Sequence, residues 1–112
     1  MGIQDWSEDV ILVNLSKEPH LSEDLKAVIA IVARRKDCDI VVDFTEVDII
    51  TSSSLASLLK LRKLIKDNGR LLTFCSVKPS TRNIFTLTGL DSVFEFADDQ
   101  FVALASLQLA KN

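Results

Sequence analysis

The sequence predicts an α/β fold, in which a mixed, mostly parallel sheet of about five strands packs against about four helices. Two observations predict it. Short runs rich in Val, Ile and Phe recur along the chain, and they are too short for helices but typical of strands. Segments with helical periodicity separate most of these runs, and a helix between two strands is the crossover that parallel pairing requires.

The first elements are expected to be a β-hairpin and a helix. The apolar stretch around Ile3 and Trp6 and the apolar run 10–15 flank a polar turn at residues 7–9. A helix is then expected to begin at Ser22, with acidic residues at its start and basic residues at its end, as the helix dipole favours. The apolar stripe of this helix should face the sheet and consists of Leu21, Leu25, Val28, Ile29 and Val32.

A central strand and a second helix are expected in the middle of the chain. Residues 39–44 contain the β-branched run Ile-Val-Val between two Asp, and such a run suits a strand covered on both faces. The second helix should follow the hydroxyl-rich segment 51–54 and end at Asn68-Gly69 in a left-handed cap. Its buried face is predicted to contain Leu55, Leu58, Leu59, Arg62 and Ile65, with Leu61 and Leu64 at its sides.

The C-terminal third is expected to contain two strands and two helices. Residues 70–77 and 94–96 are the predicted strands, and a short helix starts at Pro79 and closes at Gly89. Asp98 is expected to cap the last helix. Its buried face is predicted to consist of Phe101, Leu104 and Ala105.

Composition indicates one small soluble domain over residues 1–112. The chain is 47% hydrophobic and 26% charged, which is ordinary for a globular protein. Its formal net charge is −3, whereas a nucleic-acid-binding surface needs a basic face. Cys38 and Cys75 lack CxxC spacing and are expected to be buried thiols in a reducing compartment. No signal peptide and no apolar run of membrane-spanning length is found, so we expect a cytoplasmic protein without direct membrane insertion.

The sequence contains no motif of an enzyme. It lacks GxGxxG, GxxxxGK[ST] and GxSxG, which would indicate nucleotide binding or a nucleophile elbow. Its one histidine, His20, has no identifiable nucleophile partner, and no His/Cys cluster could hold a metal ion. We therefore expect no catalytic residue, no metal and no cofactor.

Four consecutive hydroxyl residues, Thr51, Ser52, Ser53 and Ser54, stand where the second helix is expected to begin. One such residue can cap the helix by accepting a hydrogen bond from a backbone N–H of the first turn. Four exceed that need. The alternative interpretation is a phosphoacceptor, because a phosphate at a helix N-terminus meets free N–H groups and the positive end of the dipole.

The segment from Ile40 to Ala56, IVVDFTEVDIITSSSLA, resembles the signature of STAS domains, the family of bacterial anti-sigma factor antagonists. The signature consists of a strand, an Asp, an apolar pair and a serine motif that opens a helix. The resemblance continues through the Gly turn and strand of residues 66–72 and the Pro, short helix and Gly-Leu ending of residues 79–90. It spans nearly the whole chain in order.

This resemblance implies the STAS fold and a role in partner switching. In the family, an anti-sigma factor that is also a serine kinase phosphorylates the second Ser of an Asp-Ser-Ser/Thr-Gly motif, which corresponds to Ser53. The added charge then disrupts the complex. The resemblance implies that Thr51, Ser52, Ser53 and Ser54, together with His20 in the loop before the first long helix, contact this protein partner.

Three positions depart from the family pattern. Thr51 stands where the family usually has Asp, Ser54 where it has Gly, and His20 near the place of another Asp. An alternative function therefore stays open, in which the domain docks without being phosphorylated. It would then be a subunit of an ABC-type lipid transporter or of a self-associating signalling scaffold, and a homodimer also remains open.

Overall fold

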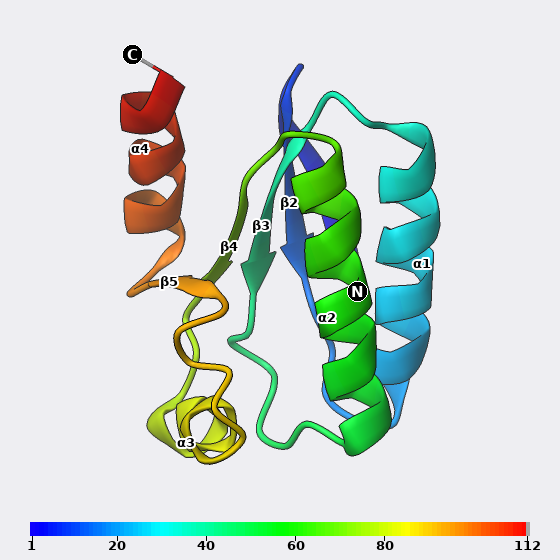
Figure 1. Ribbon diagram of the computed structural model, residues 1–112, viewed down its shortest axis with the longest axis vertical. Coiled ribbons are helices and arrows are strands. Elements are labelled where there is room, and N and C mark those ends of the chain that lie inside the picture. The colour runs from blue at the N-terminus through cyan, green and yellow to red at the C-terminus, as the bar shows by residue number, and fades with distance from the viewer. Residues whose placement is uncertain (112) are drawn as a thin grey trace.

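The computed structural model describes residues 1–111 and has a five-stranded sheet with four helices (Figure 1). The elements are β1 (Gly2–Ser7), β2 (Val10–Asn14), α1 (His20–Arg34), β3 (Asp39–Asp43), α2 (Ser52–Asp67), β4 (Leu72–Cys75), α3 (Pro79–Leu87), β5 (Glu95–Ala97) and α4 (Gln100–Lys111). The strands lie in the order β1-β2-β3-β4-β5, with β1 antiparallel to β2 and every other pair parallel. The predicted mixed, mostly parallel sheet is confirmed.

The central strand β3 is buried along its whole length, because helices cover the sheet on both sides. Alternate strand residues point to opposite faces. Ile40 and Val42 belong to the large core under α1 and α2, whereas Val41 belongs to a smaller core under α4. Figure 1 shows α1 and α2 side by side on one side of the sheet and α4 on the other.

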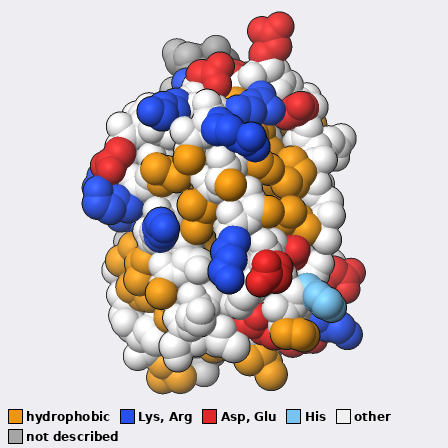
Figure 2. All heavy atoms as spheres, turned by 90° about the vertical axis from the view of Figure 1, so that its right-hand side faces the viewer, with side chains coloured by type: hydrophobic (Ala, Val, Ile, Leu, Met, Phe, Trp, Pro, Cys, Tyr) orange, Lys and Arg blue, Asp and Glu red, His pale blue; other side chains and the backbone are white. Residues whose placement is uncertain are grey.

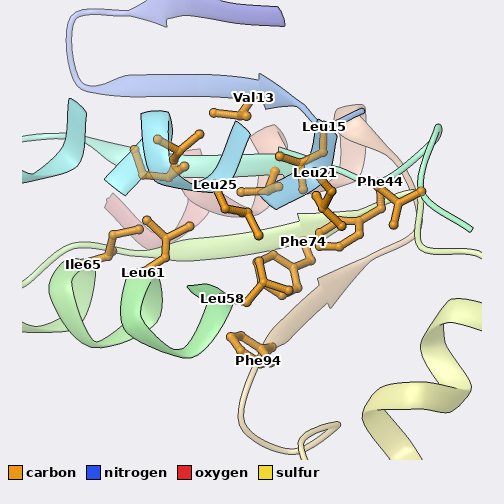
Figure 3. Close-up of a cluster of buried hydrophobic side chains, with 14 of the residues drawn as sticks. Val13, Leu15, Leu21, Leu25, Phe44, Leu58, Leu61, Ile65, Phe74 and Phe94 are labelled. Carbon is orange, nitrogen blue, oxygen red and sulfur yellow. The ribbon is translucent and has the colours of Figure 1, made fainter. Parts of the chain in front are cut away.

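The large core is built around a group of phenylalanines at the carboxyl-end half of the sheet. The rings of Phe44 and Phe74 lie 4.8 Å apart, and those of Phe74 and Phe94 are stacked at 4.7 Å. Figure 3 shows Leu58 of α2 reaching toward these rings and Leu21 and Leu25 of α1 filling the space beside them. This packing fixes the starts of α1 and α2 relative to the strand ends.

The first two helices differ from the prediction in detail. α1 begins at His20 rather than Ser22, and Ile29 is only partly buried beside the predicted stripe. In α2, Leu61 is fully buried and Leu59 is 38% exposed, so the prediction that Leu59 faces the sheet is wrong. Leu61 continues the line of Ser54, Leu58 and Ile65 along the helix, whereas Leu59 lies about 100° further round the helix from Leu58.

The prediction for α4 is wrong in its cap and, at Phe101, in its buried face, whereas the predicted Leu104 is partly buried and packs against the smaller core. Asp99, not Asp98, caps the helix, since its carboxylate accepts a hydrogen bond from the backbone N–H of Val102 at 2.9 Å. The buried residues are Ala103 and Leu107, while Phe101 is 80% exposed. The small Ala103 side chain fits where the helix packs onto the sheet, so Ala103 is buried there and the bulkier Phe101 is not.

Two local predictions, the glycine caps and the buried cysteines, are confirmed. Gly69 and Gly89 have φ values of 71° and 74°, the left-handed conformation expected after α2 and α3. Cys38 and Cys75 are free and buried. Within the part of the chain that the structure describes, no helix is both long and apolar enough to cross a membrane.

Candidate phosphoacceptor and partner-binding site

The hydroxyl-rich segment lies at the edge where the parallel strands end and α1 and α2 begin (Figure 1). Thr51 is the N-cap of α2, with an extended backbone and a side-chain oxygen that accepts a hydrogen bond from the N–H of Ser54 at 3.1 Å. Capping of this kind satisfies a backbone donor that the helix leaves free. Thr51 is thus the one of the four hydroxyl residues that caps the helix, as the sequence allowed.

Ser54 points inward and has no exposed surface. Its Oγ lies 2.9 Å from Glu18 Oε2, to which it donates, and 3.1 Å from Ser22 Oγ in α1. The first turns of α1 and α2 are therefore in direct contact. Ser54 is therefore not accessible to a partner, and the prediction that it contacts one directly is wrong for this structure. Its buried hydroxyl instead holds Glu18 and Ser22 beneath the exposed turn.

Glu18, in the loop between β2 and α1, is the acidic residue of this site. Its Oε2 accepts hydrogen bonds from the backbone N–H of Thr51 at 3.1 Å and from Ser54 Oγ at 2.9 Å. Partial burial raises the pKa of Glu18, but hydrogen bonds from Thr51, Ser54 and Ser22 outweigh that effect and hold it below its usual value. A carboxylate at the N-terminus of α2 also suits the helix dipole.

Sequence reasoning missed Glu18, because it looked for acidic side chains only where the family has Asp and found Thr51 and His20 there. The family pattern places an Asp at the position of Thr51, directly before the serines. Here the carboxylate arrives from a loop 33 residues away in the chain. No spacing rule connects two such distant positions, and the weak available signal was an acidic residue in the loop that precedes the predicted first helix.

Ser53 is exposed in the first turn of α2, as predicted from the sequence. Within residues 1–111 its hydroxyl makes no hydrogen bond, in contrast to Thr51 and Ser54 on either side. Ser52, the first residue of the helix, is also exposed. The structure thus separates the four hydroxyl residues into two whose side chains form hydrogen bonds, Thr51 and Ser54, and two whose side chains form none within residues 1–111, Ser52 and Ser53.

His20 is exposed as the first residue of α1, at the same edge of the molecule as the start of α2. Figure 2 shows its imidazole, in pale blue, on the surface beside acidic and basic side chains. The contact between Ser22 and Ser54 brings the two helix starts together. His20 and Ser53 are therefore on neighbouring turns of one surface.

The loop between β3 and α2 is held by α3. Thr81 is fully buried, and its hydroxyl lies 3.1 Å from the carbonyl oxygen of Val47 and 2.9 Å from that of Asp48. Lys78 forms an ion pair with the Asp48 carboxylate, and this contact lowers the pKa of Asp48. The loop that leads to Thr51 is therefore fixed at its middle by α3 and at its end by Glu18.

Neither a metal-binding cluster nor a hydrogen-bonded base accompanies Ser53 in the part of the chain that the structure describes. Among residues 1–111, no group of three or more His, Cys, Asp and Glu side chains could hold a metal ion. Within the same residues, no base is hydrogen-bonded to Ser53. The chemical feature that the site presents is an exposed hydroxyl group at a helix start.

The fold and the site together define an α/β domain that exposes a serine at a helix start beside parallel strand ends. The chain belongs to the STAS family: the family model described as "STAS domain" matches residues 14–100. A Bordetella bronchiseptica protein, BtrV, named as a candidate anti-sigma factor antagonist, is 28% identical over 89 residues, covering 80% of this chain and 77% of the relative.

Two further comparisons agree with this membership. The anti-sigma F factor antagonist of Paenibacillus polymyxa is 27% identical over 103 residues, which cover 89% of this chain and 88% of that protein. The phosphorylated form of SpoIIAA, a Bacillus cell fate determinant, has a similar structure, with a TM-score of 0.70 and 16% identity over 94% of this chain and 96% of that one. This structural likeness concerns the fold.

Proposed function

We propose that this protein is an anti-sigma factor antagonist that acts by partner switching, with Ser53 as its phosphoacceptor. The observation that carries the proposal is the exposed, unbonded hydroxyl of Ser53 in the first turn of α2, in a domain of the STAS family. The names of two relatives, both anti-sigma factor antagonists, support the same role. The protein itself catalyses no reaction in this proposal.

The partner is a protein of the bacterial cytoplasm, an anti-sigma factor with serine kinase activity. Thr51, Ser52, Ser53 and His20 lie on the surface that it would contact. Ser54 contributes indirectly, because its buried hydroxyl holds Glu18 and thereby the turn that carries Ser53. The proposal assigns this binding to the STAS domain, which the family model matches over residues 14–100.

A phosphate on Ser53 would change the character of this surface. It adds about −1.5 to −2 charges and three acceptor oxygens at neutral pH. At an interface that formed with a neutral hydroxyl, an unpaired charge costs several kcal/mol of binding energy. Phosphorylation therefore releases the partner, which is then free to bind its sigma factor.

The proposal is tested with the purified protein, its anti-sigma factor kinase and Mg-ATP. Intact mass should rise by about 80 daltons, one phosphate group, in the wild type and in Ser52→Ala but not in Ser53→Ala. Ser53→Asp should weaken the complex at least about tenfold, or 1.4 kcal/mol, whereas Ser53→Ala should bind as the wild type does. Ser52→Ala is the matched control, since Ser52 is the other exposed serine of the turn.

A docking role without phosphorylation is the second candidate. It is favoured by one observation, namely that Thr51 replaces the family's Asp directly before the serines. The domain would then bind as a subunit of an ABC-type lipid transporter or of a signalling scaffold, without any switch at Ser53. An unchanged mass after incubation, with equal affinities of wild type and Ser53→Asp, would support this candidate and contradict the first.

A further inference from the structure

Glu18 connects the two segments that form the proposed partner-binding surface. Through its carboxylate, the loop that leads to α1 is attached to the backbone of Thr51 and to the side chain of Ser54. The same loop is attached to α1 itself by other bonds, from Ser16 N to the Asp24 carboxylate and from Leu21 N to the carbonyl oxygen of Lys17. Loss of the Glu18 contacts would therefore detach the loop from α2 and leave it joined to α1.

The contacts of Thr51 and Ser54 explain why a negative charge added to Ser53 would affect Glu18. Thr51 and Ser54 both donate to Glu18, and Ser53 lies between Ser54 and the helix cap, in the same turn. A phosphate there seeks the free N–H groups of the helix N-terminus, which Glu18 already approaches. Two anions then compete for one positive helix end, and two like charges held at the same helical turn repel each other.

From this geometry we infer that Glu18 is a positioning residue of the switch: negative charge on Ser53 displaces the Glu18 carboxylate from Thr51 and Ser54 and detaches from α2 the loop that leads to His20, the first residue of α1. The inference rests on the proposed function for the identity of the modification. It adds that phosphorylation changes the shape of the surface as well as its charge. Both halves of the surface, the start of α2 and the loop before α1, would then respond to a single modification.

The experiment measures hydrogen exchange of the Thr51 amide by NMR in the full chain. That N–H donates to Glu18, whereas the N–H of Leu55 donates to the carbonyl oxygen of Thr51 and reports opening of the first helical turn. The variants are Ser53→Asp, Glu18→Gln and the double variant. Protein with phosphoserine incorporated at position 53 during synthesis adds the full charge without a kinase. Ser80→Asp, an exposed serine in the first turn of α3, is the matched control.

Charge at position 53 should accelerate exchange of the Thr51 amide about tenfold, as expected when a protecting hydrogen bond is lost locally. The Leu55 amide should change less than about twofold, and Ser80→Asp should change neither amide. In Glu18→Gln, whose carboxamide oxygen still accepts a hydrogen bond but carries no charge, adding Ser53→Asp should have less than about a twofold effect. Thermal unfolding of each variant checks that all of them are folded.

Equal acceleration in the Glu18→Gln background would overturn the inference, as would unchanged exchange of Thr51 in the phosphoserine protein. Equal acceleration of Thr51 and Leu55 would also overturn it, because the helix end would then be fraying. These results do not depend on a kinase or a partner. The proposed function fails separately, if the kinase leaves Ser53 unmodified or the modified protein binds as well as the wild type.

Discussion

The Asp43 carboxylate, at the end of β3, accepts a hydrogen bond from the side-chain amide of Gln100, the first residue of α4, at 2.7 Å. The same amide nitrogen lies 3.2 Å from the side-chain oxygen of Asn14 in β2. One side chain thus joins the carboxyl ends of two parallel strands to the helix on the far face of the sheet. With this start fixed, Ala103 and Leu107 fall on the sheet and Phe101 faces outward.

Replacing Gln100 should therefore loosen α4. We expect Gln100→Met, which keeps the length but removes the donors, to lower the free energy of unfolding by about 1.5–3 kcal/mol, as for a hydrogen bond to a charged acceptor. Urea unfolding measures the change. Gln108→Met, on an exposed position of the same helix, should stay within about 0.5 kcal/mol of the wild type. Equal effects of the two substitutions would contradict the assigned role of Gln100.

The two adjacent leucines of α2 should differ sharply in their contribution to stability. Leu58 is fully buried beside the phenylalanine group, so Leu58→Ala should cost about 2–5 kcal/mol. Leu59, about 100° further round the helix, is exposed, and Leu59→Ala should cost less than about 1 kcal/mol. Chemical denaturation of both variants is the test. A larger loss for Leu59→Ala would mean that the helix is rotated relative to the structure described here.

Thr81 should stabilise the loop between β3 and α2. Thr81→Val keeps the shape of the side chain but leaves the carbonyl oxygens of Val47 and Asp48 without its hydroxyl, and we expect a loss of about 1–3 kcal/mol. Thr86→Val is the control, since Thr86 is exposed on the same helix and should change stability by less than about 0.5 kcal/mol. Differential scanning calorimetry compares the two, and indistinguishable melting temperatures would exclude this role.

Glu18 should make the stability of the protein sensitive to acid. Its pKa is lower in the folded chain than its ordinary value of 4.5. A group of this kind stabilises the fold above its unfolded pKa, and the contribution is lost as the pH falls through the folded value. Between pH 7 and pH values below about 4.5, the wild type should therefore lose more stability than Glu18→Gln does. Parallel acid limbs in urea titrations of the two proteins would count against the hydrogen bonds assigned to Glu18.

The thiol of Cys75 should be unreactive in the native protein. Burial and the nearby charge of Asp43 raise its pKa to about 12, so almost no thiolate exists at pH 8. Cys38 is also buried, and burial raises its pKa as well. We expect a maleimide reagent at pH 8 to label neither cysteine in the folded protein and both in urea, as read by intact mass. Rapid labelling of the folded protein at Cys75 would show that this strand end is open to solvent.

The sheet and its order of elements could be predicted from the sequence because they depend on local patterns. Residues 39–43 form an unbroken apolar run between acidic ends, and such a run suits a strand buried on both faces wherever it occurs. Gly69 and Gly89 could be assigned because a left-handed cap strongly favours glycine. The hydroxyl-rich start of α2 followed in the same way from a local pattern, whereas the choice of Ser53 among the four residues came from the resemblance to the STAS family.

The faces of the helices depended on their neighbours. Leu59 and Phe101 are as apolar as the residues that are buried in their place, so hydrophobicity cannot rank them. For α4, the choice was made by the close approach to the sheet at Ala103 and by the bond between Gln100 and Asp43. Both are contacts between elements far apart in the chain.

The candidate site divides in the same way. The sequence by itself determined that four hydroxyl residues stand at the start of α2 and that one of them can cap it, because capping depends on residues three apart. Only the tertiary structure decided which hydroxyl groups are accessible. Ser54 is buried because Glu18 and Ser22, from segments more than 30 residues away, meet it there, and Ser53 is left exposed. Hydrogen bonds over such sequence distances form only when the sheet brings the loops together, so no local pattern encodes them.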